Sequence, residues 1–307
     1  MSRGLLALAL TAFAIAGLAP LAVMLARVAP SDLGRLLDAR TLALLGRTLA
    51  YGIGVASIAL AVGLPFGFLV ARTDMPLART LRPLGIVPLL FPPMILAMVW
   101  TVVADIRGAP AAYFVSALNT FPLVALFSAR AFERIDGRQE EAARLCGGLR
   151  AVIRCDLPLV LPAALSGACL AFVFTVNDFS VPDYVSWVGT KFNVYADEIF
   201  ATWKIDSAPG RAVATALPLV ALTLLTLLPA LALRRKGALA SLSGDFRQPA
   251  TLRIGVWRWP AFAFCVAVLV LGVAIPVARL VWEAGGGQRG FALAHIATSF
   301  QLAIERS

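Results

Sequence analysis

Long apolar stretches separated by short charged segments dominate the pattern of the chain. Because a membrane-spanning helix needs about 20 mostly apolar residues, seven stretches qualify as spans. They cover residues 4–26, 48–71, 84–104, 112–129, 159–181, 212–233 and 260–281, and an eighth begins near Phe291. A soluble protein would not repeat this pattern so often, so the pattern predicts an all-α, polytopic transmembrane helix bundle.

Composition agrees with a membrane protein. The chain is 60% apolar and 14% charged, and its mean hydropathy is +0.85, outside the range of soluble domains. The uncharged run after Arg3 is long enough to span, which favours an uncleaved anchor over a cleaved signal peptide. Nearly every predicted span contains proline, which is typical of kinked membrane helices.

The distribution of Lys and Arg predicts the orientation. With the N-terminus inside, the predicted cytoplasmic segments hold 16 Lys and Arg residues and the outer segments hold ten. By the positive-inside rule, the N-terminus and the charged loop before residue 159 are cytoplasmic. The net charge of +10 is explained by Arg residues facing membrane lipid headgroups, so nucleic acid is not an expected partner.

A capped helix is predicted in the charged loop at 132–158. Asp136 suits the N-cap position, and two glutamates follow in the first turn, where the helix dipole favours negative charge. Two alanines then leave a face with almost no side chain, and a glycine supplies the C-terminal stop. A Leu-Pro pair opens the next span. The residues of this motif are Glu140, Glu141, Ala142, Ala143, Gly147, Leu157 and Pro158.

The Glu-Ala-Ala run, three residues, a Gly and then Leu-Pro resemble the coupling loop of ABC importer permeases. Leu64-Pro65 and Phe91-Pro92-Pro93 are similar to the first half of fused permeases of the ferric iron and thiamine type. The resemblance covers most of residues 40–235. One departure is that the distance from Gly147 to Leu157 is two residues shorter than usual, so the contact surface after Gly147 is expected to differ.

The resemblance implies a type I permease fold in a bacterial inner membrane. It implies that a cytoplasmic ABC ATPase dimer contacts the loop, and that a periplasmic solute-binding protein delivers the solute. Ferric iron is the expected solute, and thiamine or a phosphonate- or polyamine-like solute is the alternative.

The domain organisation predicted is a first permease half at 1–235 with six spans, a cytoplasmic linker at 236–258, and the start of a second half at 259–307. The segment 297–303 echoes 46–52. Because an ABC importer needs two coupling loops, we expect the front part of a longer fused permease. A half that forms a homodimer is the alternative.

Two features are predicted on the outer side. Asn177 and Asp178 fall at the outer end of the fifth span, either as a polar span end or as a gate on the substrate pathway. Tyr195, Ile199 and Trp203 recur at helical spacing and predict an amphipathic helix at the interface. That helix is either an aromatic anchor or a docking site for the binding protein.

No catalytic, metal or cofactor site is expected. The cysteines lack C-x-x-C spacing, His295 has no partner cluster, and no phosphate-binding loop exists, so ATP hydrolysis must reside on a partner. An ion-coupled secondary transporter usually needs a buried acid or base near the midplane, and no predicted span has a clear one. An intramembrane enzyme needs a Ser/His, paired-Asp or metal constellation that one histidine cannot supply.

Overall fold

The computed structural model describes residues 38–204, 209–238, 247 and 249–286, with scattered positions between 4 and 34. In chain order its helices are α3 (Ala39–Arg72), α4 (Ala78–Leu84), α5 (Val87–Leu90), α6 (Pro93–Ala104), α7 (Gly108–Glu133), α8 (Gly137–Asn177), α9 (Ser180–Val188), α10 (Tyr195–Lys204), α11 (Pro209–Ala238), η3 (Gly255–Trp257), α12 (Arg258–Leu269), η4 (Val270–Ala274) and α13 (Ile275–Ala284). This confirms the predicted all-α class. The first predicted span lies largely outside the described residues, as do Phe291, His295 and 297–303.

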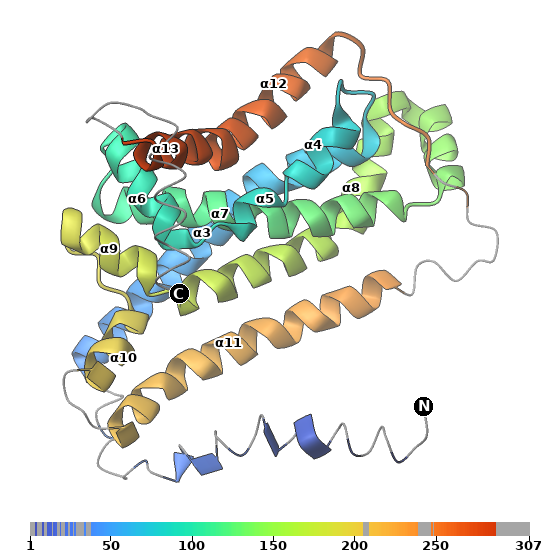
Figure 1. The fold of residues 1–307 in the computed structure, drawn as a ribbon. Helices are drawn as coiled ribbons and strands as arrows, with labels where there is room; N and C mark the ends of the chain where they lie inside the picture. The colour runs from blue at the N-terminus through green and yellow to red at the C-terminus, as the bar shows by residue number, and fades with distance from the viewer. Residues whose placement is uncertain are drawn as a thin grey trace.

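Five described helices are long and apolar enough to cross a membrane, and a sixth crossing is possible if one bent pair counts as a span. Helix α7 is central, since 78% of its most apolar window is buried, against 33% for α3 and 17% for α11. Helices α3 and α8 pack on α7, and α11 packs on α8 (Figure 1). Helices α12 and α13 cross the opposite side of the bundle, beside α4 and α6 (Figure 1).

Two glycines allow α3 to approach α7 closely. A Cβ atom on Gly63 would lie 2.7 Å from the carbonyl oxygen of Phe121, and one on Gly67 would lie 2.2 Å from Oγ of Ser128. Membrane helices lack a hydrophobic drive to associate, so small residues one turn apart favour packing of backbone against backbone. This contact fixes the position of the α3 C-terminus, which belongs to the site described below.

The predicted span at 84–104 is broken into two helical arms. Residues Ala78–Leu90 and Pro93–Ala104 form two arms bent by 96°. The break falls at Pro92, which has extended backbone (φ −56°, ψ 125°) and no N–H to continue the helix. The buried side chain of Asn119 on α7 donates to the carbonyl oxygens of Pro88 (2.8 Å) and Phe91 (3.0 Å). Such bonds satisfy backbone groups that a broken membrane helix leaves free.

The other predicted spans that fall within the described residues, from residue 48 to residue 281, are present with shifted ends. Helix α3 begins nine residues before the predicted span at 48–71, and α11 runs on to Ala238. The fifth span ends at Asn177, so Val181 belongs to α9. The last described span covers Gly255–Ala284 and contains the π-helical turn η4.

Candidate coupling site

The first limb of α8, residues 137–146, forms the helix that the sequence predicts in the charged loop, and we call it the coupling helix. Oδ1 of its N-cap, Asp136, accepts a hydrogen bond from the backbone N–H of Arg138 (3.0 Å). Two residues with non-helical backbone form an elbow before the second limb: Gly147 (φ −170°, ψ 20°) and Gly148 (φ 63°, ψ −152°). The backbone of Gly148 lies in a region that is essentially restricted to glycine. The helix and its glycine stop are confirmed.

The coupling helix has one face toward the protein and one toward solvent. Glu140 and Ala143 are buried, at 2% and 8% exposed, whereas Glu141, Ala142 and Gly147 are exposed. The two alanines therefore lie on different faces. Leu145, which sequence analysis did not single out, is 91% exposed. An aliphatic side chain at this exposure on a capped helix is a candidate partner contact.

A buried cluster of charges ties the coupling helix to the end of α3. The guanidinium of Arg72 lies 2.5 Å from Glu140, and both side chains are 2% exposed. Arg72 also donates to the carbonyl oxygen of Phe132 (3.0 Å) and lies 3.8 Å from the carboxylate of Asp156, within ion-pair range. Arg144 donates to the other oxygen of Glu140 (2.7 Å). Two cations thus face two carboxylates, which is the condition for burying charge.

Sequence analysis missed Arg72 because it counted this residue only as a charge at a span end. A signal was available, since an arginine directly after an apolar stretch can bury its stem and reach a nearby acid. What the sequence does not show is that the coupling helix folds back under α3.

Part of the predicted linker covers the coupling helix, and we call residue 247 with residues 249–254 the linker strap. The N–H of Leu252 donates to the carbonyl oxygen of Arg72 (2.7 Å), and the N–H of Asp74 donates back to Leu252 (3.2 Å). The Leu252 side chain is 1% exposed and packs with Ala143 and Val152. Leu252 therefore fills the inward small-residue face of the coupling helix.

Arg247 makes the second contact of the strap with the coupling helix. Its guanidinium lies 3.0 Å from Glu141, and its carbonyl oxygen accepts from the N–H of Gly137 (3.0 Å). The Arg247 and Glu141 side chains are both more than half exposed, so this ion pair contributes little to stability. The remaining motif residues, Leu157 and Pro158, lie exposed on the second limb of α8.

Asn177 and Asp178 lie at the opposite end of α8, as predicted. Asn177 donates to Oγ1 of Thr223 on α11 (3.0 Å). Oδ1 of Asp178 accepts from the N–H of Ser180 (2.9 Å) at the start of α9. Both residues thus join neighbouring helices. Their role as an outer gate stays a prediction.

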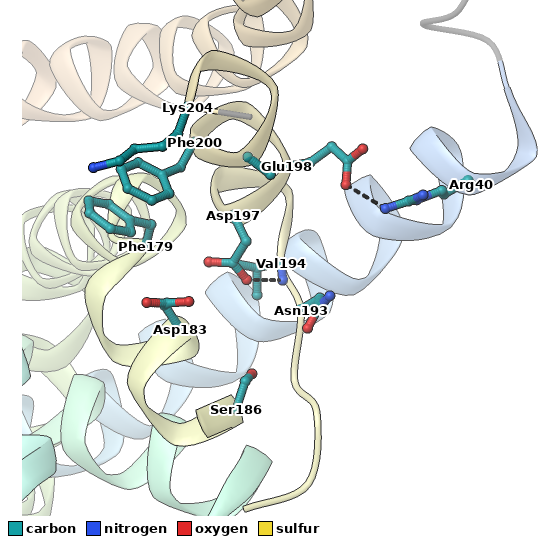
Figure 2. A pocket seen from close by; sticks show the side chains of 11 residues that line it. Arg40, Phe179, Asp183, Ser186, Asn193, Val194, Asp197, Glu198, Phe200 and Lys204 are labelled. Atoms are coloured by element: carbon teal, nitrogen blue, oxygen red, sulfur yellow. Dashed lines mark hydrogen bonds and ion pairs between the residues drawn. The ribbon is translucent and has the colours of Figure 1, made fainter. Parts of the chain in front are cut away.

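The predicted amphipathic helix is α10, and it borders a cavity of about 420 Å³ at the end opposite the coupling helix. Figure 2 shows Asp183, Asp197 and Glu198 around this cavity, with Glu198 paired to Arg40 of α3 (2.9 Å). Burial raises the pKa of Asp197 to about 7, although its bond from the N–H of Val194 opposes the shift.

The aromatic stripe of α10 divides between core and surface. Tyr195 is fully buried and its N–H donates to Oγ1 of Thr48 (2.8 Å), whereas Trp203 is 60% exposed. Phe200 stacks on Phe179, the residue before α9, with ring centroids 4.8 Å apart. In the part of the chain that the structure describes, no three His, Cys, Asp or Glu side chains gather into a possible metal site.

Comparison with known proteins adds to this geometry. The family model described as "Binding-protein-dependent transport system inner membrane component" matches residues 63–236. The "Molybdenum transport system permease protein ModB" of Escherichia coli (strain K12) is 28% identical over 148 residues, covering 41% of this chain and 65% of that protein. The chain therefore spans about two thirds of that relative, and the same protein of Escherichia coli O157:H7 matches equally.

Among solved structures, an inward-facing MetNI methionine ABC transporter matches with a TM-score of 0.49 at 21% identity, covering 64% of this chain and 94% of that chain. The family match is the decisive finding, since it covers more than half of the sequence and includes the coupling helix, its elbow and the second limb of α8. The chain belongs to the family of inner-membrane components of binding-protein-dependent transport systems, the permeases of ABC importers.

Proposed function

We propose that this chain is a permease of a binding-protein-dependent ABC importer that receives its driving motion at the coupling helix. A cytoplasmic ATPase dimer hydrolyses ATP and contacts residues 137–147, and a periplasmic solute-binding protein delivers the solute to the opposite end. The N-terminus is cytoplasmic. The observation that carries the proposal is the pairing of Glu140 with Arg72, because it connects a solvent-facing helix directly to a membrane span.

The two faces of the coupling helix have different roles in this proposal. Glu141, Ala142 and Gly147 are exposed and form the contact with the ATPase, together with Leu145. Glu140 and Ala143 are buried and hold the helix to the membrane bundle. Leu157 and Pro158 begin the part of α8 that carries the motion onward.

Motion can pass to two spans at once. The coupling helix continues through its elbow into the second limb of α8, and it holds α3 through Arg72. Since α3 and α8 both pack on α7, a displacement of the coupling helix shifts both neighbours of the central helix. Coupling requires such a contiguous physical connection or a shared two-state element.

For the solute we propose ferric iron, as the resemblance to fused permeases implies, with thiamine or a phosphonate- or polyamine-like solute as alternatives. A further candidate is molybdenum, which the name of the ModB relative specifies for that protein. Uptake of radiolabelled ferric iron and of radiolabelled molybdate, by the complex with its cognate binding protein and ATPase, separates these candidates.

An ion-coupled secondary transporter is the competing function. Within the described residues, the fully buried charged side chains are Arg72, Glu140 and Asp156. All three belong to the cluster at the coupling end, whereas ion-coupled transport usually places such groups near the midplane. This distribution favours the ABC permease.

The test is a charge reversal on the exposed face, Glu141→Lys, in the assembled transporter. We expect loss of ATPase stimulation by the solute-loaded binding protein, with a normal amount of chain in the membrane. Glu283→Lys reverses another exposed glutamate, at the far end of α13, and should leave stimulation unchanged. Full stimulation in Glu141→Lys combined with Gly147→Trp would contradict the assignment.

A further inference from the structure

A second cavity lies between the coupling helix and the linker strap. Its volume is about 330 Å³, and it is lined by Arg144, Gly148, Thr251, Leu252 and Arg253. Two of these five residues are arginines and none is acidic. The cavity joins the elbow of the coupling loop to the strap, although the two are about a hundred residues apart in the sequence.

The walls of this cavity are fixed by buried contacts. Leu252 is locked by its backbone bonds to Arg72 and Asp74 and by its buried side chain, so Thr251 and Arg253 are held on either side of it. On the opposite wall, Arg144 is oriented by Glu140 (2.7 Å) and keeps 42% of its side chain exposed. Gly148 leaves the space between them open, since a Cβ atom there would meet nothing within 4 Å.

The chemistry of the lining selects an anionic oxygen group. An arginine presents several N–H donors in a planar fork that matches a carboxylate, and the hydroxyl of Thr251 adds one donor. Glu140 engages only part of the Arg144 fork. Arg253 is exposed and has no acidic partner among the described residues.

We propose that the strap and the coupling helix form one docking surface, and that this cavity receives a carboxylate side chain of the ATPase. The proposal rests on the proposed function and extends its contact surface to a segment outside the family motif. Position favours the ATPase as the source of the carboxylate. Gly148 of the cavity lies three residues after Leu145, whose exposed side chain marks the face assigned to the same partner.

A carboxylate bound in this cavity would contact the coupling helix and the linker strap at the same time. The strap leads directly into η3 and α12, and α12 packs on α3 and α4. Movement of a partner bound to Arg144 and Arg253 is therefore transmitted both to the coupling helix and, through the strap, to α12.

The experiment measures the affinity of the purified ATPase for the detergent-solubilised chain with Arg253→Glu, Arg253→Lys and Arg150→Glu. Arg150 is an exposed arginine two residues past Gly148 that does not line the cavity. We expect Arg253→Glu to raise Kd at least about tenfold, because the new carboxylate would repel the carboxylate of the ATPase, and like charges placed together at an interface are costly. Arg253→Lys should have an intermediate effect, and Arg150→Glu should stay within about twofold of the unmodified chain.

The outcomes separate this proposal from the proposed function. Loss of ATPase binding in Leu145→Asp with unchanged binding in Arg253→Glu overturns only the cavity proposal. Equal losses of ATPase affinity in Arg253→Glu and Arg150→Glu also overturn it, since they indicate nonspecific attraction between charged surfaces. If Arg253→Glu co-purifies with less phosphatidylglycerol than the unmodified chain but binds the ATPase with unchanged affinity, the cavity holds a lipid headgroup instead. Undiminished binding in Leu145→Asp with Glu141→Lys overturns the coupling-helix assignment itself. Restoration of Arg253→Glu binding by an acid-to-arginine change on the ATPase supports the proposal directly.

Discussion

Arg72 reaches three separate parts of the chain: Glu140 on the coupling helix, Asp156 on the second limb of α8, and the carbonyl oxygen of Phe132 at the end of α7. The motif residue Glu140 is predictable from the sequence, but its burial is not, because only the folded chain brings Arg72 beneath it. The adjacent Glu141 faces solvent. Two neighbouring glutamates of one motif therefore serve a structural contact and a surface contact.

A double-mutant cycle tests the Arg72–Glu140 pair. Arg72→Ala leaves the buried Asp156 without a cation and Glu140 with Arg144 alone, so we expect a loss of about 3–5 kcal/mol in unfolding free energy. Glu140→Ala should cost a similar amount. The double variant should lose clearly less than the sum of the two, because it removes the Glu140 carboxylate together with the cation that balanced it. Thermal unfolding in detergent gives the comparison, and strictly additive losses would show that the pair does not interact.

The raised pKa of Asp197 predicts a pH-dependent stability at the other end of the molecule. Burial raises its folded-state pKa to about 7, so between the unfolded value near 3.9 and about 7 the folded state binds the extra proton. Stability from this group is complete below about pH 4, falls as pH rises to about 7, and then stays low. Asp197→Asn should therefore raise Tm more at pH 8 than at pH 5. An equal change at both values would show an ordinary carboxyl pKa.

At the scale of the element, the elbow of α8 shows what sequence patterns can and cannot locate. The glycine pair predicts a helix stop, but the motif directs attention to Gly147, whereas Gly148 has the positive φ. The break inside the predicted span at 84–104 escaped the sequence analysis for a related reason. Hydropathy averages over the break at Pro92, and Asn119, which satisfies the freed carbonyl groups, lies on another helix. Tertiary partners of this kind leave no periodic signal in the sequence.

We expect substitutions at the two glycines of the elbow to cost different amounts of stability. Gly148→Ala forces a side chain into a backbone region of high strain, so it should cost about 1–3 kcal/mol in unfolding free energy. It should also lower the amount of solute transported per ATP. Gly147→Ala keeps an extended φ and meets only the Cβ atom of Ala151 at 3.0 Å, so its cost should be smaller. Chemical denaturation of both variants provides the measurement, and a larger cost at Gly147 would contradict this account of the elbow.

At the scale of the whole molecule, the fold collects distant segments at two ends. The end of α3, the coupling helix, the linker strap and the start of η3 lie together at one end, joined by ion pairs and backbone hydrogen bonds. The end of α8 and helices α9 and α10 lie at the other (Figure 1). The Lys and Arg distribution predicted the same grouping without any knowledge of contacts, because membrane insertion sorts charges by side. Which end faces the cytoplasm follows from the charges alone and stays a prediction.

Reporter fusions test this orientation. Alkaline phosphatase is active only outside the cytoplasm, so a fusion after Lys191, between α9 and α10, should be active. A fusion after Gly148, at the elbow, should be inactive, and one after Arg253, in the strap, should match it, because the strap and the coupling helix are in contact through Leu252 and Ala143. A cytoplasmic reporter at the same sites should give the inverse pattern and serves as the control. Activity after Gly148 would place the coupling helix where no ATPase can reach it, and the coupling model would fail with the topology.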